Sequence, residues 1–475
     1  MEEVYMPFNS YYNLFTNTIY NTPLPKSPVQ FFSNFDAVNN HCRIAKATFY
    51  LQDPSTLGTK GEGVRVANVS VTGNTLANSM ITSVHQVNPN PDGNFVFSPL
   101  TEEFNITNAF VITNLVVKMY QKILQNINTT HKFLNWQWGA GQPLTVDVYA
   151  GMEQNAFYAR SKKALKFFYF PDQSGKIVYT SESLDVVAHE TGHAVLDALM
   201  PGYSNPTLLG RNGKLYSNPE TGALHEAFGD LTAIFLLLSL PGVSNILINQ
   251  TKGNVHIPTF LNSLAEEFGH ASGQVALRNA DNDLTFAQAT NGYTNFEIHQ
   301  LSSVFTGAIY DIFVDFFNLN KVKNAATLIA TAENVQKLLL MAIFVGPQEG
   351  ASYVDIVLEM FKLEPDPVKR DIIQYQFFTK RGLCRINYQG YGMSELISTQ
   401  YNKNPDNRSC ATLPHHACRH GHAIAKCIHN NSANTNRLPE KFYCPPTMLF
   451  SSQVNQPIIY PTRSYDPLLS RYRLV

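Results

Sequence analysis

The chain has 475 residues, of which 44% are hydrophobic and 12% aromatic, and its formal net charge at pH 7 is −1. This apolar content is sufficient for one large or two medium hydrophobic cores. Lys and Arg number 35 against 36 Asp and Glu, with no basic run, which argues against nucleic acid as a partner. The longest apolar run, Leu231 to Leu240, is too short for a transmembrane segment and predicts a buried helix.

Residues 1–45 are rich in Asn, Tyr, Phe and Pro without a sustained period, which predicts an extended N-terminal arm. The first residues are acidic and lack the basic and apolar regions of a secretory signal. We therefore expect a cytoplasmic protein or one exported by a leaderless route. Secretion after removal of a signal is the alternative.

The first half of the chain after the arm has the alternation of apolar and polar residues that predicts strands. The predicted strands are Ala45–Leu51, Val64–Val71, Leu144–Ala150, Ala156–Ala159, Lys166–Phe170 and Ile177–Thr180. A single long helix is predicted among them, at Asn108–Ile127.

After Pro201 the pattern changes to helices separated by Pro, Gly and Asn. The predicted helices are Gly222–Leu240, Phe296–Phe317, Ala325–Phe344, Tyr353–Phe361 and Pro367–Lys380. The sequence thus predicts an α+β fold, with a sheet-rich N-terminal half and a helical C-terminal half. The junction between two such halves is a common place for a cleft.

The segment that joins the two halves, Asp185 to Leu196, contains the motif H-E-x-x-H. In a helix His189 and His193 lie one turn apart on the same face, so both imidazoles can bind one ion. Two neutral imidazoles at this spacing bind Zn²⁺, and the glutamate between them, Glu190, would deprotonate a zinc-bound water. The chemistry that this arrangement indicates is peptide hydrolysis.

The alternative is an amphipathic core helix whose histidines only pack. The apolar stripe of this helix is complete without either histidine; it consists of Leu184, Val187, Val195, Leu196 and Leu199. Ser181 or Ser183 can cap the helix, and Pro201 ends it. These features favour the metal-binding interpretation.

Two histidines and a water leave a tetrahedral zinc ion one protein ligand short. A third histidine six residues after His193 is absent, because that position is Leu199. The segment Thr221 to Asp230 offers Glu226 instead, with Asp230 one turn further on. Apolar neighbours predict a buried helix there, where an unpaired carboxylate is costly. We therefore expect Glu226 to bind the metal and Asp230 to orient a ligand imidazole.

The two motif segments closely resemble the thermolysin-like family of zinc metallopeptidases, the gluzincins. Three weaker stretches extend the resemblance, in the expected order, over residues 45 to 383. Gln154–Tyr158 resembles the substrate-binding edge strand of the family. Ala276–Asn279 and Ile298–Ser303 resemble the segments that carry its substrate arginine and its second catalytic histidine. The resemblance implies a thermolysin-like fold and a zinc-dependent endopeptidase.

The resemblance also implies roles for individual residues. One Zn²⁺ would be bound by His189, His193 and Glu226. Glu190 would activate the water and pass its proton to the leaving amine. His299 would donate to the oxyanion, and Arg278 would bind a substrate carbonyl.

Four further residues would bind the peptide substrate. Asn155 and the backbone of Ala156 would pair with it as an added strand. Val186 and Leu277 would line an apolar pocket, which implies a preference for a large apolar residue after the scissile bond.

Several positions depart from the family pattern. The tyrosine that donates to the oxyanion would be Tyr216, with Tyr203 as a competitor. The carboxylate that orients the second histidine falls at Thr294, so Glu297 or Asn295 would have to replace it. A calcium-binding carboxylate of the family falls at Leu237, although Asp185 is present, so the double calcium site of the family is doubtful.

The chain divides into four predicted regions: an N-terminal arm (1–45), an α+β catalytic subdomain (46–200), a helical catalytic subdomain (201–383) and a Cys/His-rich extension (384–475). Five of the six cysteines lie in this extension, which the resemblance does not cover. Their spacing matches no standard zinc finger, and both disulfides and a second metal site remain open.

Two rivals to a zinc endopeptidase are open. The first is a catalytically silent relative that binds a peptide or protein partner in the cleft, although Glu190, Glu226 and His299 are all present. The second is an aminopeptidase with the same ligands, but the chain has no Gly-x-Met-Glu-Asn segment to bind a free amine. The partner expected in the first place is a peptide or protein substrate.

Overall fold

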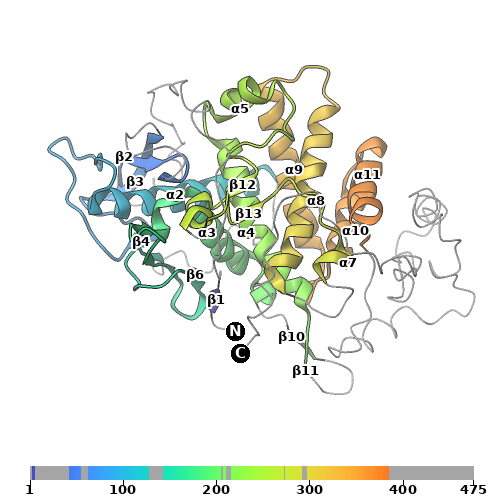
Figure 1. Ribbon diagram of the computed structural model, residues 1–475, viewed down its shortest axis with the longest axis horizontal. Coiled ribbons are helices and arrows are strands. Elements are labelled where there is room, and N and C mark those ends of the chain that lie inside the picture. Colours follow the sequence, from blue (N-terminus) through green and yellow to red (C-terminus); the bar gives the residue numbers. More distant parts are fainter. Residues whose placement is uncertain are drawn as a thin grey trace, which may run out of the picture.

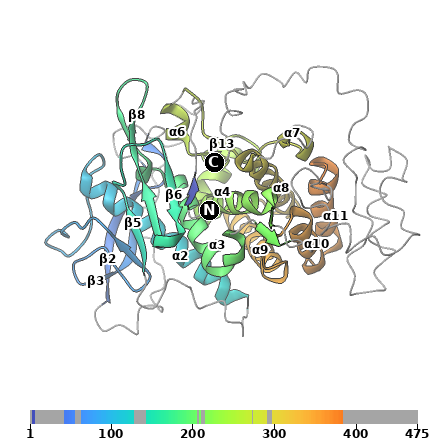
Figure 2. The same cartoon turned by 90° about the horizontal axis from the view of Figure 1, so that it is seen from below.

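The computed structural model describes residues 3–5, 42–54, 63–127, 143–204, 207–209, 215–271, 273–290 and 297–383. The predicted extension 384–475 and nearly all of the predicted arm lie outside these residues. Within them, strands and one long helix form one side of the molecule and helices form the other (Figures 1 and 2). Two central helices, α3 (Leu184–Leu199) and α4 (Pro219–Ser239), lie between the two sides.

The sheet-rich side begins with a long antiparallel hairpin, β2 (Cys42–Tyr50) and β3 (Val64–Thr72). The hairpin packs on α2 (Glu102–Asn126), whose N-cap Thr101 accepts a hydrogen bond from the backbone of Phe104 at 3.1 Å. Helix α2 in turn packs against α3, so the hairpin supports the central helices from outside.

A five-stranded sheet has the order β1-β6-β7-β5-β4. The strands are β1 (Glu3–Tyr5), β4 (Ile81–Ser83), β5 (Leu144–Asp147), β6 (Ala156–Ala159) and β7 (Ala164–Phe167). Strands β4, β5 and β7 are parallel, whereas β6 and β1 add in the antiparallel direction. A separate hairpin, β8 (Tyr169–Pro171) and β9 (Ile177–Tyr179), leads into the 3₁₀ turn Thr180–Glu182 and then α3.

The two central helices cross unusually closely, because each has a glycine at the crossing. A Cβ atom on Gly192 of α3 would lie 2.6 Å from Oγ1 of Thr232 on α4. A Cβ atom on Gly229 of α4 would lie 2.7 Å from the His189 ring on α3. Distances this short are not tolerated, so glycine at both positions permits the approach of the two helices.

The helical side follows a short connection made of the 3₁₀ helix η4 (Pro201–Ser204) and the hairpin β10 (Thr207–Leu209) and β11 (Leu215–Ser217). Its long helices are α8 (Ile298–Asn318), α9 (Ala325–Val345), α10 (Tyr353–Leu363) and α11 (Pro367–Gln374), the last continued by a π-helical turn, Tyr375–Lys380. Shorter elements are α5 (Val243–Thr251), α6 (Glu266–Ala271), α7 (Phe286–Ala289) and the strand pair β12 (Ser263–Leu264) and β13 (Arg278–Asn279). Helices α8 and α9 both pack against α4.

The predicted α+β architecture, with a sheet-rich first half and a helical second half, is confirmed. The buried apolar residues of both halves form one contiguous core that includes α3 and α4. Helices α4 and α9 are long and apolar enough to span a membrane by composition alone, but 94% and 61% of the relevant windows are buried inside the fold. This is the behaviour of core helices in a folded domain.

Candidate metal centre

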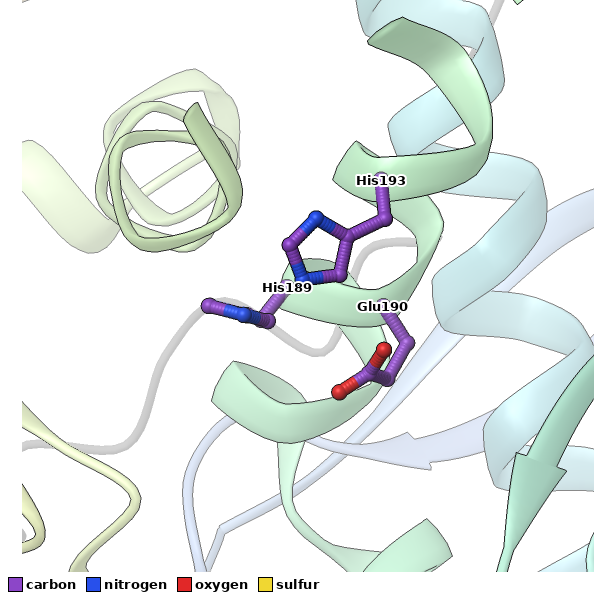
Figure 3. Close-up of side chains that lie close together, drawn as sticks. All are labelled: His189, Glu190 and His193. Atoms are coloured by element: carbon purple, nitrogen blue, oxygen red, sulfur yellow. The ribbon is translucent and has the colours of Figure 1, made fainter. Parts of the chain in front are cut away.

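The side chains of His189 and Glu190, which are adjacent in α3, and of His193, one turn further on, lie close together (Figure 3). Ser183 caps this helix, and its hydroxyl accepts a hydrogen bond from the backbone of Val186 at 3.2 Å. The rings of His189 and His193 meet edge to face with centroids 4.5 Å apart. All three side chains are buried.

Helix α4 brings Glu226 to both imidazoles. Its Oε2 atom lies 3.3 Å from Nε2 of His189, and its Oε1 atom lies 3.5 Å from Nε2 of His193. Ligand atoms held about 2.0–2.1 Å from a tetrahedral zinc ion are separated by ~3.3 Å. The two distances from Glu226 are therefore those expected between ligands of a tetrahedral zinc ion.

The potential ligand atoms of these three side chains make no hydrogen bonds among the described residues. Nε2 of His189, Nε2 of His193 and both carboxylate oxygens of Glu226 are buried without a hydrogen-bonding partner there. Buried polar atoms are nearly always hydrogen-bonded. Two imidazole nitrogens and one carboxylate are the donor set of zinc sites in hydrolases, so the residues present fit a zinc ion.

The outer face of His189 is held by Asp230, whose Oδ1 lies 2.9 Å from Nδ1 of the ring. Arg278 donates to the same oxygen, from NH2 at 2.7 Å and from Nε at 3.1 Å. Burial alone would lower the pKa of His189, but Asp230 and Glu226 outweigh it and raise the pKa to about 9. The predicted orienting role of Asp230 therefore has a matching contact.

The outer face of His193 is held by a second histidine. Nδ1 of His193 lies 2.6 Å from Nδ1 of His225, the residue that precedes Glu226 on α4. Nε2 of His225 lies 3.2 Å from Oγ of Ser204. Burial lowers the pKa of His193 well below its ordinary value and that of His225 to about 4, so both rings are neutral.

Glu190 and Glu226 differ in charge although both are fully buried. Burial raises the pKa of Glu190 to about 8, against the nearby charge of His189. Burial would also raise the pKa of Glu226, but the charges of His299 and His189 lower it overall. The backbone of Tyr158 opposes part of this rise in the pKa of Glu190, whose oxygens make no side-chain hydrogen bond among the described residues. Glu190 is thus a carboxyl group able to take up and release a proton beside the centre.

His299, the expected second catalytic histidine, lies at the start of α8 and faces the same centre. Its Nε2 atom is 3.5 Å from Oε2 of Glu226, and its side chain is 15% exposed. Of the two carboxylate replacements expected from the sequence, Glu297 contacts it: Oε1 of Glu297 lies 2.6 Å from Nδ1 of His299. Glu297 also caps α8 by accepting from the backbone N–H of Gln300. Thr294 and Asn295 lie outside the described residues.

Asn155 and Ala156, the expected substrate-binding residues, lie at the start of β6. Oδ1 of Asn155 accepts from the N–H of Ala156 at 2.9 Å. In the structure β1 pairs antiparallel with β6, with Val4 opposite Tyr158 and Tyr5 opposite Phe157. An extended segment of the chain itself thus lies on the strand that was expected to pair with substrate.

A small, partly open pocket lies next to the centre and has room for little more than a water molecule. It is lined by Asp185, Val186, His189, Asp230, Ala233, Leu264, Ala265 and Arg278. Val186 was expected there, whereas Leu277 is not among the lining residues and packs against the core instead. Ligand pockets usually enclose roughly 300–1,000 Å³, so this one is much smaller than a typical ligand pocket.

The two tyrosine candidates are placed differently. Tyr216 lies in β11, opposite Leu208 of β10, and its side chain is outside the described part of the structure. Tyr203 is buried in η4, where burial and the charge of Asp355 raise the pKa of its hydroxyl. The choice between them stays a prediction.

A second acidic cluster lies at the N-terminal end of α3. Asp53, Asp185 and Glu266 are buried and have donor atoms within 4.8 Å of one another. Leu237, where the family has a calcium-binding carboxylate, is buried in the apolar core. Asp185 therefore has acidic neighbours from the segment that follows β2 and from α6.

The sequence prediction missed three residues around the centre: His225, Ser204 and Asp197. His225 is adjacent to Glu226 in sequence, and this position was the only signal available. Ser204 Oγ donates to Oδ1 of Asp197 at 2.8 Å, a contact between η4 and the last turn of α3. Only the folded connection between α3 and α4 brings these groups together.

Comparison with known proteins adds two findings. Residues 33–197 match the family described as thermolysin metallopeptidase, catalytic domain, and this confirms the resemblance that the motifs predicted. Among solved structures, the precursor of protealysin, a metalloproteinase from Serratia proteamaculans, is similar at 14% identity, with 63% of this chain and 86% of that chain covered and a TM-score of 0.37. No curated protein matches the chain. The family match ends at Asp197, before Glu226, His299 and Arg278.

Proposed function

We propose that the chain, whose residues 33–197 match the thermolysin metallopeptidase family, is a zinc-dependent endopeptidase. The family accounts for the metallopeptidase class and for the two histidines of α3. The observation that carries the proposal lies beyond the matched residues. Glu226 approaches His189 and His193 within 3.3 and 3.5 Å, and none of the facing donor atoms makes a hydrogen bond to any other described residue.

In this proposal His189, His193 and Glu226 hold one zinc ion, with Asp230 supporting His189 from behind. When bound, zinc would polarise a substrate carbonyl and lower the pKa of a water molecule toward about 7. The protein contributes a dry, buried setting in which such charges interact strongly.

Glu190 supplies the proton transfers. Its carboxyl group is buried, has a pKa near neutrality and makes no side-chain hydrogen bond among the described residues, so its ionised form can accept a proton from the attacking water. The same group then donates that proton to the nitrogen of the leaving amine. A side chain of this kind contributes typically 10²–10⁴-fold to the rate.

His299 and Arg278 stabilise the substrate as negative charge develops on its carbonyl oxygen. Burial would lower the pKa of His299, but the charges of Glu226 and Glu297 raise it overall, which favours the ring with a proton on Nε2. Arg278 is fixed by Asp230 and its side chain is 12% exposed, so part of its guanidinium remains accessible. Both groups are held in place before substrate binds, which is the property that favours a transition state.

The substrate would bind as an extended strand along β6, with one side chain in the pocket lined by Val186 and Leu264. The pairing of β1 on β6 supports this binding mode, because it shows that the edge of β6 accepts an antiparallel strand. The apolar lining favours a large apolar residue after the scissile bond.

The same pairing favours a second candidate, a catalytically silent protein that binds a peptide or protein partner on β6. Glu190→Gln distinguishes the two. For an endopeptidase, the variant keeps zinc and loses at least ~10²-fold in kcat on a peptide library. Glu103→Gln, at an exposed position of α2, is the matched control and should keep full activity.

Two results would reject the endopeptidase. One is a zinc-loaded parent protein that cleaves no peptide in the library. The other is a Glu190→Gln variant with unchanged, chelator-sensitive turnover.

A further inference from the structure

A continuous chain of hydrogen-bonded polar side chains runs from His193, at the metal centre, to Asp197 in the last turn of α3. It starts at Nδ1 of His193, which is 2.6 Å from Nδ1 of His225. It continues from Nε2 of His225 to Oγ of Ser204 at 3.2 Å, and from there to Oδ1 of Asp197 at 2.8 Å. All but Ser204 of these residues are less than a tenth exposed.

The far end of this chain is fixed by two further groups. The hydroxyl of Tyr158, on the proposed substrate strand β6, donates to Oδ2 of Asp197 at 2.9 Å. Nε of Arg160 lies 2.7 Å from Oδ1 of Asp197. The carboxylate of Asp197 therefore has donors on both oxygens and can only accept. Its position is set by β6 and by the turn that follows β6.

An acceptor at one end fixes the direction of every hydrogen in the chain. Ser204 has a single hydroxyl hydrogen, which it gives to Asp197, so its oxygen must accept from His225. A neutral His225 that carries its hydrogen on Nε2 has a bare Nδ1. At 2.6 Å, only a hydrogen on Nδ1 of His193 can fill the space between the two rings.

We propose that His225, supported by Ser204 and Asp197, is a positioning residue that holds His193 in the Nδ1–H tautomer with its Nε2 lone pair directed at Glu226 and the metal centre. The proposal rests on the proposed function only in that His193 is taken as a metal ligand. Partners of this kind fix both the tautomer and the ring orientation of a ligand histidine.

A purely space-filling role for His225 is the competing explanation. Phenylalanine at this position keeps a planar ring and removes both nitrogens, whereas asparagine offers a carbonyl oxygen close to the place of Nδ1. His225→Phe and His225→Asn thus separate hydrogen bonding from packing. Ser204→Ala removes only the link to Asp197. Ser244→Ala, which removes a buried hydroxyl that donates to the backbone of Leu238 in the last turn of α4, is the matched control.

Two quantities are measured on the full chain. The first is the apparent zinc dissociation constant, from competition with a chromophoric chelator. The second is the tautomer of His193 in zinc-free protein, from the ¹⁵N chemical shifts of its imidazole. We expect His225→Phe to weaken zinc binding by about 10–100-fold and to give a mixture of His193 tautomers. His225→Asn should stay within about threefold of the parent, and Ser204→Ala should fall between the two.

The proposal is overturned if His225→Phe binds zinc as tightly as the parent and keeps the Nδ1–H tautomer, or if His225→Asn is as weak as His225→Phe. Should His225→Phe fail to fold, Ser204→Ala decides. If Ser204→Ala leaves both the His193 tautomer and the zinc affinity unchanged, the positioning role of His225 is rejected. A parent that binds zinc but cleaves no peptide would reject the endopeptidase alone. If the parent protein does not bind zinc, the ¹⁵N shifts of His193 still give its tautomer. The Nδ1–H tautomer then supports the positioning role of His225, and the other tautomer rejects it.

Discussion

Oδ1 of Asp230 lies 2.9 Å from Nδ1 of His189, and the same carboxylate is fully buried. Arg278 donates twice to that oxygen, so one carboxylate orients an imidazole of the metal centre and a guanidinium of the proposed substrate site. The metal centre and the substrate site therefore share a single support.

Asp230→Asn is expected to weaken zinc binding by about 10–100-fold, because a neutral amide oxygen lacks the negative charge that makes His189 a better metal ligand. Chelator competition measures this. Asp371→Asn, at an exposed position of α11, is the control and should bind zinc normally. An Asp230→Asn variant with parental zinc affinity would show that His189 needs no such support.

His299→Phe should lower kcat by about 10²–10³-fold with zinc content unchanged, because it keeps a ring but removes one donor to the developing oxyanion. Steady-state kinetics with a peptide substrate, together with metal analysis, provide the measurement. Loss of zinc in this variant would instead mean that His299 takes part in metal binding. Glu297→Gln should give a smaller loss, since the histidine remains but loses its orienting carboxylate.

Gly229→Ala should destabilise the protein by about 1–3 kcal/mol and weaken zinc binding, because the new methyl group would lie 2.7 Å from the His189 ring. Gly222→Ala on the same helix is the matched control. Its methyl group would meet only Ile298, at 3.4 Å, and alanine is the better helix former, so no destabilisation is expected. Thermal unfolding of both variants tests the difference. Equal melting temperatures would contradict the close crossing of α3 and α4.

The acidic cluster beside α3 should make zinc-free protein less stable as pH rises. Burial raises the folded-state pKa of Asp53 to about 6 and that of Glu182 to about 7, and it raises the pKa of Asp185, Glu266 and Glu267 well above their ordinary values. In an unfolded chain such groups titrate near pH 4. The folded state therefore holds more protons between about pH 4 and pH 7, and its stability is lost as pH rises through that window.

Denaturant unfolding at pH 5 and pH 8, in the presence of a chelator, measures this loss. Each change of one in a pKa corresponds to about 1.4 kcal/mol, so the loss should be a few kcal/mol. Asp53→Asn should reduce the dependence on pH. Calcium added without chelator should restore stability at pH 8 more than at pH 5, since a divalent cation binds the ionised carboxylates. Stability that is constant or rises with pH would contradict the raised pKa values.

The pairing of β1 with β6 predicts competition with substrate. Successive N–H groups of a strand point to opposite sides, so only one of the N–H groups of Val4 and Tyr5 faces β6. The double substitution Val4→Pro with Tyr5→Pro removes that N–H group. A net hydrogen bond is worth about 1 kcal/mol, so kcat/KM should rise about fivefold. Kinetics on one peptide substrate test this. A variant with unchanged or lower kcat/KM would show that β1 does not compete.

The sequence predicted those parts of the site that depend on local periodicity. The spacing of His189 and His193, and of Glu226 and Asp230, follows from helix geometry, and both helices form where they were expected. Strand β6 has the predicted bounds, Ala156–Ala159. Such features are set within a few residues of the chain, so they can be predicted from one sequence.

The contacts that sequence could not predict join distant elements. Asp53 meets Asp185 because the segment that follows β2 is folded against the start of α3, and no period in the chain records this approach. Leu277 was expected in the pocket, but a short strand pair presents Leu264 there instead. Helices α5, α6 and α7 were also missed, because elements of four to nine residues carry too few repeats of a helical pattern.

The glycine crossing of α3 and α4 has a consequence for how the protein can be divided. A fragment that ends at Asp197, where the family match ends, would lack α4. It would expose the apolar side of α3 to water, and His189 and His193 would lack the carboxylate of Glu226. Such a truncated piece should aggregate rather than give a small working enzyme. The stretch of chain that matches the family is therefore shorter than the stretch that is needed for folding.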